Sequence, residues 1–416
     1  MAHPDLIAHR AQTRRDIIAL APGIWTAVGY AASNVHMIEG AGTVTIIDTS
    51  ESTSAAENIL AGFRIRSPKP VGRIIYTHAH RDHISGASVF SDGSQPILAS
   101  HLHRSDLVAV DDQPPFPHRA LGRRTQAQFG FGLTAEERIS LGCGPGDRPV
   151  EGLGAGYLHP TQLVEADRDI DLDGVAARLI HAPGETEDHL CVWLPDQGIL
   201  FSGDNWYHAF PNLYAIRGTA YRDFGVWAES LALLEALGAE VLAPGHTRPV
   251  TGKAQVREVL RTTRAAILHV MEQTALGMDR GLPMDDIVAG LTLPEELAAK
   301  PWLKEFYGKI GWAARAFAAG TLGWYEGNPT QLGTLSKAER AAHVAALAGG
   351  TDALMRAAEQ TQDVQWRLEL CDHLIALQAP AKGLKAQAMR ALAEVEINAT
   401  ARNTYLWEAK RLEQEA

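Results

Sequence analysis

The sequence predicts an α/β domain followed by an all-α domain. Strand patterns, helix patterns and glycine-rich loops alternate up to about residue 250, as is typical of an α/β sandwich. From Ala254 onward, apolar residues recur at helical spacing and strand patterns are missing. The chain has 416 residues, which is more than one hydrophobic core usually supports. We therefore predict two domains, residues 1–252 and residues 253–416.

Strand patterns dominate the start of the first domain. Residues 24–49 are predicted to form strands, because residues 24–28 and 43–48 alternate or run apolar as sheet strands do. Residues 52–64 follow with a helical pattern. The next strand, residues 72–76, ends at Thr77 and leads directly into a polar loop. Such a loop can turn several side chains toward one point, so we expect functional residues just after this strand.

The segment of residues 111–162 differs from the rest of this domain because it is rich in glycine and proline. A loop of this length inside a compact domain usually carries a function. We predict that it covers the active site; the alternative is an inert surface insertion.

The second half carries helix signals only. Ser336 and Glu339 form a capping-box signature, and the helix that they begin should end at Gly349-Gly350. Three further helices are expected at these places: from about residue 352, over residues 362–377 and over residues 382–395. This half is therefore predicted to be helical throughout.

The composition excludes several classes of protein. The chain is 46% hydrophobic and 21% charged, as globular proteins are, so we do not expect disorder. Its net charge of −11 argues against nucleic-acid binding, which relies on basic residues. No apolar run reaches the roughly 18 residues of a membrane-spanning helix, and the N-terminus does not resemble a signal peptide. We therefore expect a soluble cytoplasmic protein without a membrane partner.

The cysteines are Cys143, Cys191 and Cys371. They are far apart and odd in number, so they predict neither a disulfide framework nor a cysteine-type zinc site. We interpret them as small buried hydrophobic residues.

The stretch from residue 78 to residue 83 is the most informative in the sequence. His78, His80, Asp82 and His83 follow a predicted strand, and neutral imidazole and carboxylate are good ligands for zinc. Packing seldom explains such a set, because each polar group would need a buried partner. The alternative is a solvated histidine-rich loop. The strand context favours a metal site.

This HxHxDH pattern resembles the signature of the metallo-β-lactamase superfamily. Residues 201–204, Phe-Ser-Gly-Asp, resemble the strand end with the metal-bridging aspartate, and residues 244–246, Pro-Gly-His, resemble the loop with the last histidine ligand. The resemblance implies an αββα sandwich and two metal ions, with Asp204 between the metals and His246 as a ligand. Zinc is the expected metal, and other divalent metals remain open.

A glutamate narrows the resemblance to one branch. Glu185 stands where most members of the superfamily have a further histidine ligand, and a carboxylate at this place resembles the alkylsulfatases. Glu187, Asp188 and His189 could compete for this role, but we expect them to be supporting or surface groups. His181 is expected to support the turn.

The resemblance implies two ligand sets. The set for the first metal is His78, His80 and Glu185. The set for the second metal is Asp82, His83 and His246. Asp204 is expected to bridge the two metals.

A second segment supports the alkylsulfatase branch. Residues 212–218, Asn-Leu-Tyr-Ala-Ile-Arg-Gly, resemble the segment that contacts the sulfate group. The resemblance implies that Asn212 and Arg217 bind the sulfate, since a guanidinium can bind two oxygens at once. The alternative for Arg217 is a surface ion pair. Pro211 departs from the family pattern, which has a histidine there.

Two residues are candidates for a direct catalytic role. His208 matches a histidine of the alkylsulfatase segment and is expected to help with protonation or positioning. Asp82 is expected to combine metal binding with catalysis. Asp204 replaces the usual glutamate of the branch, which leaves the metal site intact but bears on the substrate assignment.

The helical half extends the resemblance over nearly the whole chain. Residues 307–308, 323–329 and 401–406 are similar to parts of the alkylsulfatase dimerisation domain. The resemblance therefore implies that residues 253–416 form a helical dimerisation domain and that the protein is a homodimer.

Taken together, the resemblance implies a dinuclear metal-dependent hydrolase that cleaves alkyl sulfate esters, which are small anionic substrates, with a metal-bound hydroxide. Attack on sulfur and attack on carbon both remain open. The alternatives on the same scaffold are a lactonase, a β-lactamase-like amidase or a thioesterase, because a fold does not fix a substrate. A non-catalytic dimeric binding protein and an iron-dependent oxidoreductase are more distant alternatives.

Overall fold

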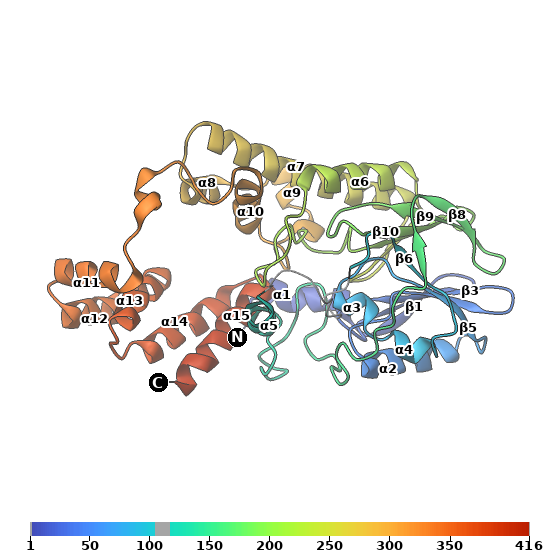
Figure 1. Cartoon of the computed structure of the whole chain (residues 1–416), viewed down its shortest axis with the longest axis horizontal. Helices are drawn as coiled ribbons and strands as arrows, with labels where there is room; N and C mark the ends of the chain where they lie inside the picture. Colours follow the sequence, from blue (N-terminus) through green and yellow to red (C-terminus); the bar gives the residue numbers. More distant parts are fainter. Residues whose placement is uncertain (1, 105–116, 416) are drawn as a thin grey trace.

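The computed structural model describes residues 2–104 and 117–415. Two β-sheets lie face to face, and helices cover the outer face of each sheet (Figure 1). Further helices extend from one end of this sandwich. The predicted αββα sandwich followed by a helical region is therefore confirmed.

The first sheet has the strand order β1-β2-β3-β4-β5-β6-β7. Its strands are β1 (Asp16–Ala21), β2 (Ile24–Val28), β3 (Val35–Glu39), β4 (Val44–Ile47), β5 (Val71–Ile75), β6 (Ile97–Ser100) and β7 (Gln162–Val164). β1 to β4 pair antiparallel, and β4 to β7 pair parallel. The helices α2 (Thr53–Arg64) and α4 (Ala87–Phe90) cover its outer face. The predicted strands and the helix at 52–64 are present, and β3 lies within the predicted strand region of residues 24–49, whereas β1 was not predicted.

The second sheet has the order β13-β12-β11-β10-β9-β8. Its strands are β8 (Arg168–Asp171), β9 (Ala176–His181), β10 (Leu190–Leu194), β11 (Ile199–Gly203), β12 (Val241–Pro244) and β13 (Val250–Thr251). Buried side chains of both sheets form the core between them, and the helices α6 (Phe224–Ala236) and α7 (Lys253–Asp279) pack on the outside. β11 and β12 are apolar because each is covered on both faces.

The chain turns at one edge of the sandwich to bring loops together. β5 ends at Ile75 and leads through a short loop into α3 (Arg81–Ile84). β11 and β12 run parallel, so their carboxyl ends meet at the same edge of the second sheet. The Leu190 N–H donates to the Thr77 carbonyl at 2.7 Å, which ties the two edges to each other.

The remaining helices belong mainly to the second half of the chain. They are α1 (Pro4–His9), η1 (Arg10–Thr13), α8 (Met284–Gly290), α9 (Glu295–Ala298), η2 (Pro301–Leu303), α10 (Ile310–Leu322), η3 (Pro329–Gly333), α11 (Lys337–Ala348), α12 (Thr351–Gln360), α13 (Val364–Ala376), α14 (Lys382–Val395) and α15 (Ala399–Gln414). None of the described helices combines the length and the hydropathy that crossing a bilayer requires.

The sequence signals of the second half are confirmed. The side chain of Ser336 accepts the Glu339 N–H, and the Glu339 carboxylate accepts the Ser336 N–H, which completes the capping box. α11 ends at Ala348, and Gly349 follows with φ 91°, a conformation that favours glycine. The three helices expected further along are α12, α13 and α14.

The boundary that we predict near residue 252 does not coincide with a gap in the core. Val256, Val259 and Leu260 of α7 are buried together with side chains of α6 and of β11 and β12. The start of α7 therefore packs as part of the sandwich, and the division at residue 252 stays a prediction.

The glycine-rich segment contains a helix that was not predicted, α5 (His118–Gln128). Its first turn has no side-chain cap, so it lacks the usual signal for a helix start. α5 packs against α15 near the end of the chain (Figure 1). Residues 111–116 of the predicted loop lie outside the described part.

Candidate metal centre

Two groups of ligand atoms meet where the loops of both sheets converge. Within each group the atoms lie within 4.8 Å of one another. The first group is His78, His80 and Asp204; the second is Asp82, His83 and His246. Six of the seven predicted metal ligands are therefore brought together from three separate stretches of the chain.

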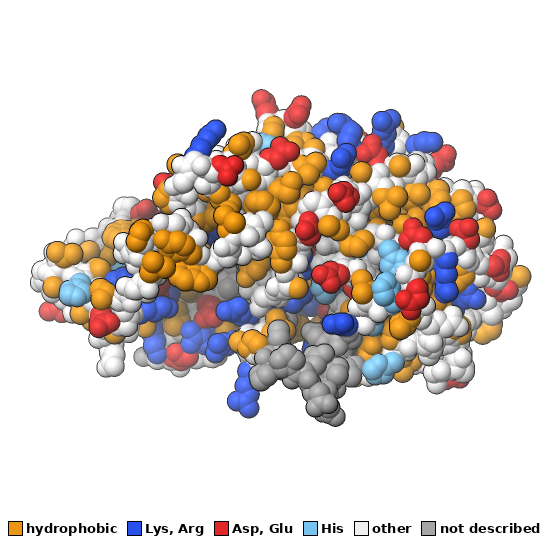
Figure 2. All heavy atoms as spheres, turned by 45° about the horizontal axis from the view of Figure 1, so that its top comes forward, with side chains coloured by type: hydrophobic (Ala, Val, Ile, Leu, Met, Phe, Trp, Pro, Cys, Tyr) orange, Lys and Arg blue, Asp and Glu red, His pale blue; other side chains and the backbone are white. Residues whose placement is uncertain are grey.

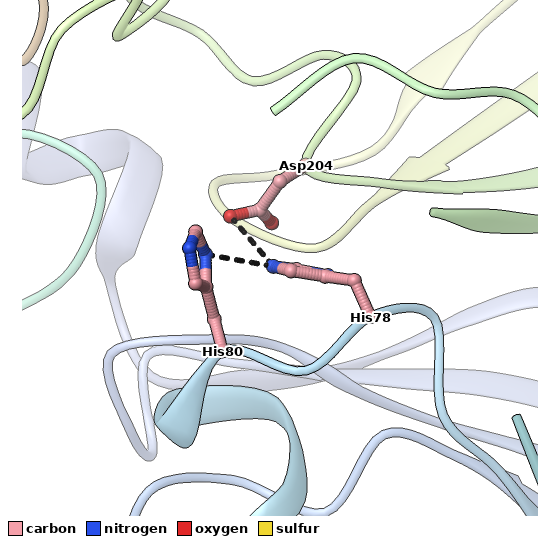
Figure 3. Close-up of side chains that lie close together, drawn as sticks. All are labelled: His78, His80 and Asp204. Carbon is pink, nitrogen blue, oxygen red and sulfur yellow. Dashed lines mark hydrogen bonds and ion pairs between the residues drawn. The ribbon is translucent and has the colours of Figure 1, made fainter. Parts of the chain in front are cut away.

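The first group joins the loop after β5 to the end of β11 (Figure 3). His78 Nε2 lies 3.0 Å from His80 Nδ1 and 3.7 Å from Asp204 Oδ2. The seventh predicted ligand, Glu185, lies beside this group, with Oε1 3.7 Å from His80 Nδ1. The side chains of His78, His80 and Asp204 point toward one another, as a metal site requires.

Asp204 also reaches the second group. Its Oδ1 lies 3.3 Å from His83 Nε2, and its Oδ2 lies 3.1 Å from His246 Nε2. Asp82 Oδ2 lies 3.6 Å from His83 Nε2 and 3.4 Å from His246 Nε2. The carboxylate of Asp204 thus contacts members of both groups, as a bridging ligand would.

Two buried atoms without a well-formed hydrogen bond show that the residues fit bound cations. His83 Nε2 and Asp204 Oδ1 lie 3.3 Å apart as an ion pair, and neither makes a hydrogen bond of good geometry to a described residue. Leaving a buried polar atom unpaired costs about 1–3 kcal/mol. A cation held by these nitrogen and oxygen donors would satisfy both atoms, and such a donor set suits zinc and similar divalent metals.

The charge states favour ligation in the first group. Burial holds the pKa of His78 and of His80 well below the ordinary histidine value, so both imidazoles are neutral. Burial alone would raise the pKa of Asp204, but the nearby His246 and His83 keep it well below its usual range. A neutral imidazole and an ionised carboxylate are the forms that bind metal.

The second group holds protons when no metal competes for it. Burial lowers the pKa of His83 and of His246, but the charge of Asp204 outweighs it and raises both pKa values well above the ordinary value. These two imidazoles must lose a proton before their Nε2 atoms can bind a cation.

Asp48, which the sequence analysis missed, positions the second group. Its Oδ2 lies 2.7 Å from His83 Nδ1, and its two oxygens accept the N–H and the hydroxyl of Thr77 at 2.8 Å. Asp48 has φ 59°, an uncommon value for a residue other than glycine, and such backbone strain is concentrated at functional sites. A carboxylate behind a ligating histidine fixes the orientation of its ring.

Two glycines make room for the ligands. Gly203 has φ 48°, and a Cβ there would lie 2.6 Å from the His189 ring. At Gly245, a Cβ would lie 2.4 Å from Asp204 Oδ1. The glycines that precede Asp204 and His246 are therefore required by close approach.

Backbone and buried groups support His246 from its other side. Its Nδ1 lies 2.7 Å from the Ala32 carbonyl oxygen, which fixes the ring. Cys143 is buried, as predicted, but its thiol also interacts with His246, a location that the sequence did not reveal. Cys143 belongs to the glycine-rich segment, so part of that segment lies against the second group, which supports the predicted cover.

Glu185 is the most constrained of the predicted ligands. Arg222 Nη1 lies 3.0 Å from Oε1, and the Tyr207 hydroxyl donates to Oε2 at 3.2 Å. Burial raises the pKa of Glu185 to about 7, while the charge of Arg222 opposes this shift. Arg222 and Tyr207 stand alone in the sequence, so no motif indicated them.

The neighbours that could compete with Glu185 point elsewhere. Asp188 Oδ2 lies 3.4 Å from His103 Nδ1, and His189 Nε2 accepts the Asp204 N–H at 3.0 Å. Glu187 is exposed. His181 Nε2 lies 3.1 Å from the Val164 carbonyl oxygen. These contacts agree with the supporting or surface roles that we expected.

The predicted substrate residues follow Asp204 in an irregular segment. Asn212 is buried, and its N–H donates to the Tyr207 hydroxyl at 2.7 Å. Arg217 is partly exposed; its N–H donates to Gln128 Oε1, and its guanidinium donates to the Gly218 carbonyl. Burial, and then the positive charge of Arg217, lower the pKa of His80.

No described contact joins the ring of His208 to the metal candidates. The ring packs edge-on against Trp206 and Trp302, and the backbone N–H of His208 donates to Thr247 Oγ1. Its carbonyl oxygen lies 2.7 Å from His9 Nε2. The catalytic role of His208 stays a prediction, and these contacts favour positioning of the loop after His246 over proton transfer.

Two family models match the chain. The model of the metallo-beta-lactamase superfamily matches residues 28–246, and the model of alkyl sulfatase dimerisation matches residues 283–415. The first range contains all seven predicted metal ligands. The second covers most of the helical half.

Characterised relatives cover almost the whole chain. A linear primary-alkylsulfatase of Pseudomonas sp. (strain ATCC 19151) is 34% identical over 91% of this chain and 73% of its own length. An alkyl/aryl-sulfatase of Saccharomyces cerevisiae is 29% identical over 96% of this chain, which spans 64% of that protein.

Solved structures agree with these relatives. A stereoselective inverting sec-alkylsulfatase from Pseudomonas sp. superposes with a TM-score of 0.89 at 27% identity, over 100% of this chain and 68% of that one. Sequence, fold and ligand geometry thus lead to one assignment. The chain belongs to the alkylsulfatases of the metallo-β-lactamase superfamily.

Proposed function

We propose that this protein hydrolyses alkyl sulfate esters with two divalent cations held at the candidate metal centre. The observation that carries the proposal is the contact of Asp204 with both ligand groups, 3.7 Å from His78 and 3.1 Å from His246. The name of the relative at 34% identity points to linear primary alkyl sulfates as substrates.

The predicted ligands form one set for each cation. The first cation would be held by His78, His80 and Glu185, the second by Asp82, His83 and His246, with Asp204 between them. Bound cations lower the pKa of a coordinated water and withdraw electron density from an ester oxygen. We propose zinc for both sites, since imidazole and carboxylate suit it.

The substrate anion would lie against Asn212 and Arg217. Burial and the positive charge of Arg217 lower the pKa of His80, which supports placing an anion bound by this guanidinium beside the first group. An amide and a guanidinium offer several donors to the sulfate oxygens.

Asp82 and His208 remain the catalytic candidates. The side chain of Asp82 is 28% exposed, whereas the side chains of His83, His246 and Asp204 are at most 3% exposed. Asp82 is therefore the member of the second group that can also accept a hydrogen bond from the attacking water. His208 would act by holding the loop beside His246.

We further propose that the protein is a homodimer, supported by the match of residues 283–415 to the dimerisation model. The cytoplasmic location expected from the sequence also remains a proposal, which cell fractionation would test.

Metal quantification followed by a substrate panel tests the proposal. We expect about two zinc ions per chain and hydrolysis of a primary alkyl sulfate that stops on chelation and returns with zinc. A lactone, a thioester and a chromogenic β-lactam serve as controls. Turnover of one of these without turnover of any alkyl sulfate would reject the proposed substrate class.

A further inference from the structure

A closed ring of hydrogen bonds links Glu185 to the backbone of Asn212. The Tyr207 hydroxyl donates to Glu185 Oε2 at 3.2 Å and accepts the Asn212 N–H at 2.7 Å. Arg222 Nη1 lies 3.0 Å from Glu185 Oε1 and donates to the Asn212 carbonyl oxygen. The same two side chains therefore hold both oxygens of the carboxylate and both polar backbone atoms of Asn212.

The segment around Asn212 is irregular, and the nearest backbone bonds to another part of the chain are those of Phe210 with Lys304 and Gly308. Residues 204–223, between β11 and α6, contain neither helix nor strand. A buried backbone N–H or carbonyl must find a partner, and at Asn212 both partners belong to the ring. The position of Asn212 therefore depends on where Tyr207 and Arg222 lie.

Stability alone does not explain the ion pair in this ring. The side chains of Arg222 and Glu185 are both 2% exposed, and Arg222 Nε and Nη2 are buried without a hydrogen-bond partner among the described residues. Replacing a buried ion pair with apolar side chains is often neutral or stabilising. The ion pair is therefore better explained by the geometry that it imposes than by stability.

We propose that Arg222 and Tyr207 are positioning residues which fix Asn212 relative to Glu185, so that cation binding by the first group and sulfate binding by Asn212 depend on each other. This inference rests on the proposed function, because it takes Glu185 as a metal ligand and Asn212 as a sulfate contact. It explains why one carboxylate is held at both oxygens by side chains that also reach the substrate segment.

Two variants open the ring, and a third tests whether another cation can keep it closed. Arg222→Met removes the contacts to Glu185 and to the Asn212 carbonyl, and Tyr207→Phe removes the other two contacts. Arg222→Lys keeps a cation that can reach the same oxygens. Arg257→Met is the matched control, since Arg257 pairs with Glu235 at 3.2 Å on the surface and its side chain is 73% exposed.

The readouts are metal retention of the zinc-loaded protein against a chelator, the dissociation constant of inorganic sulfate, and KM and kcat for a primary alkyl sulfate. Loss of a group that positions a ligand typically costs 10–100-fold in metal affinity. In Arg222→Met we expect about tenfold weaker zinc retention, together with about tenfold weaker sulfate binding and a higher KM. Tyr207→Phe should shift both properties in the same direction, and Arg222→Lys should restore part of both.

Zinc retention and sulfate binding that match the Arg257→Met control would overturn the inference. A change in only one of the two properties would also reject it, because the ring predicts that they move together. If Arg222→Met does not fold, as judged by thermal unfolding, Tyr207→Phe and Arg222→Lys decide the question. A wild-type protein that binds zinc and sulfate but hydrolyses no alkyl sulfate would reject the proposed function, while these binding measurements would still test the ring.

Discussion

The two ligand groups differ in what holds them in place. In the second group, Asp48 lies behind His83 at 2.7 Å, and the Ala32 carbonyl oxygen lies behind His246 at 2.7 Å. Both supports come from the first sheet and its loops. Beside the first group, Arg222 and Tyr207 hold Glu185, the further ligand predicted for the first cation, and both belong to the segment that carries the predicted sulfate contacts.

This difference predicts that the two ligand groups respond to different changes in the protein. The second group rests on a carboxylate and a backbone carbonyl that do not contact the substrate segment. The first group shares its supports with Asn212. We therefore expect the second group to respond to changes in the sandwich and to pH, and the first group to respond to changes at the substrate segment.

Removing Asp204 should have the largest effect, because its carboxylate contacts members of both groups. Asp204→Ala is expected to lose both zinc ions and to reduce hydrolysis to the level of the metal-free protein. Atomic absorption and turnover of a primary alkyl sulfate measure the two outcomes. A variant that kept one zinc ion with full affinity would show that Asp204 serves a single group.

Asp48→Asn should separate the two groups. The amide keeps the size of the side chain but removes the negative charge behind His83, so zinc affinity at the second group should fall by about 10–100-fold. The first group should lose less affinity, because Asp48 contacts none of its ligands directly. It reaches His78 only through the Thr77 hydroxyl, which lies 3.0 Å from His78 Nδ1. Stepwise competition with a chelator would show one weakened site. Equal weakening of both sites would contradict the division.

Metal binding should release protons mainly at the second group. The pKa values of His83 and His246 are raised well above the ordinary value by Asp204, so both rings are protonated in the metal-free protein at neutral pH and must become neutral to bind. Affinity at this group should therefore fall as the pH falls, by about tenfold per pH unit for each proton released. The imidazoles of the first group are neutral already and should release none.

Calorimetry of zinc binding in buffers of different ionisation enthalpy measures this release. At pH 8, one unit above the value of about 7 for Glu185, that carboxyl should contribute little. The same proton count for both bound ions would remove the predicted contrast between the groups.

Arg217→Ala should have a smaller effect, confined to anionic substrates. A hydrogen bond to a charged group contributes about 1.5–3 kcal/mol, so KM for a primary alkyl sulfate should rise by about tenfold or more. The ligands of both groups remain, so zinc content should stay unchanged. An equal loss with a neutral carboxylic ester would show that Arg217 does not recognise the sulfate.

The sequence predicts the parts of this centre that follow local patterns. His78, His80, Asp82 and His83 lie within six positions after a strand, so their proximity depends on one loop. Asp204 and His246 could be predicted because their resemblance to known segments supplies the long-range contact that a single sequence lacks. The helical half was predictable through caps such as Ser336, whose effect is confined to one turn.

The supports of the centre could not be predicted in this way. Asp48, Arg222 and Tyr207 are single residues without a motif, and only the packing of distant loops brings them to their ligands. The same holds for Cys143, which was predicted to be buried but whose position against His246 depends on the course of the glycine-rich segment. Tertiary contacts between residues at least 22 positions apart determine these roles.

The smallest effect on the metal centre should come from substitutions at the end of α10 and in α11, which lie apart from both ligand groups (Figure 1). Leu322, Trp324 and Leu347 are 74%, 70% and 90% exposed, and Figure 2 shows hydrophobic side chains gathered at this end of the molecule. Exposed apolar clusters of this kind mark interaction surfaces. We expect a second copy of the chain to cover them, because they lie within the range of the dimerisation model.

Leu322→Glu combined with Trp324→Glu should therefore shift the protein from dimer to monomer, since each charge would have to be buried in the interface. Light scattering coupled to gel filtration measures the mass, and Lys337→Glu, which changes charge at the start of α11, serves as the control. Zinc content and the proton count of the second group should stay as in the wild type. A monomer that loses zinc from the first group alone would instead show that the partner subunit supports Glu185 or Asn212, and the contrast between the groups would then extend across the interface.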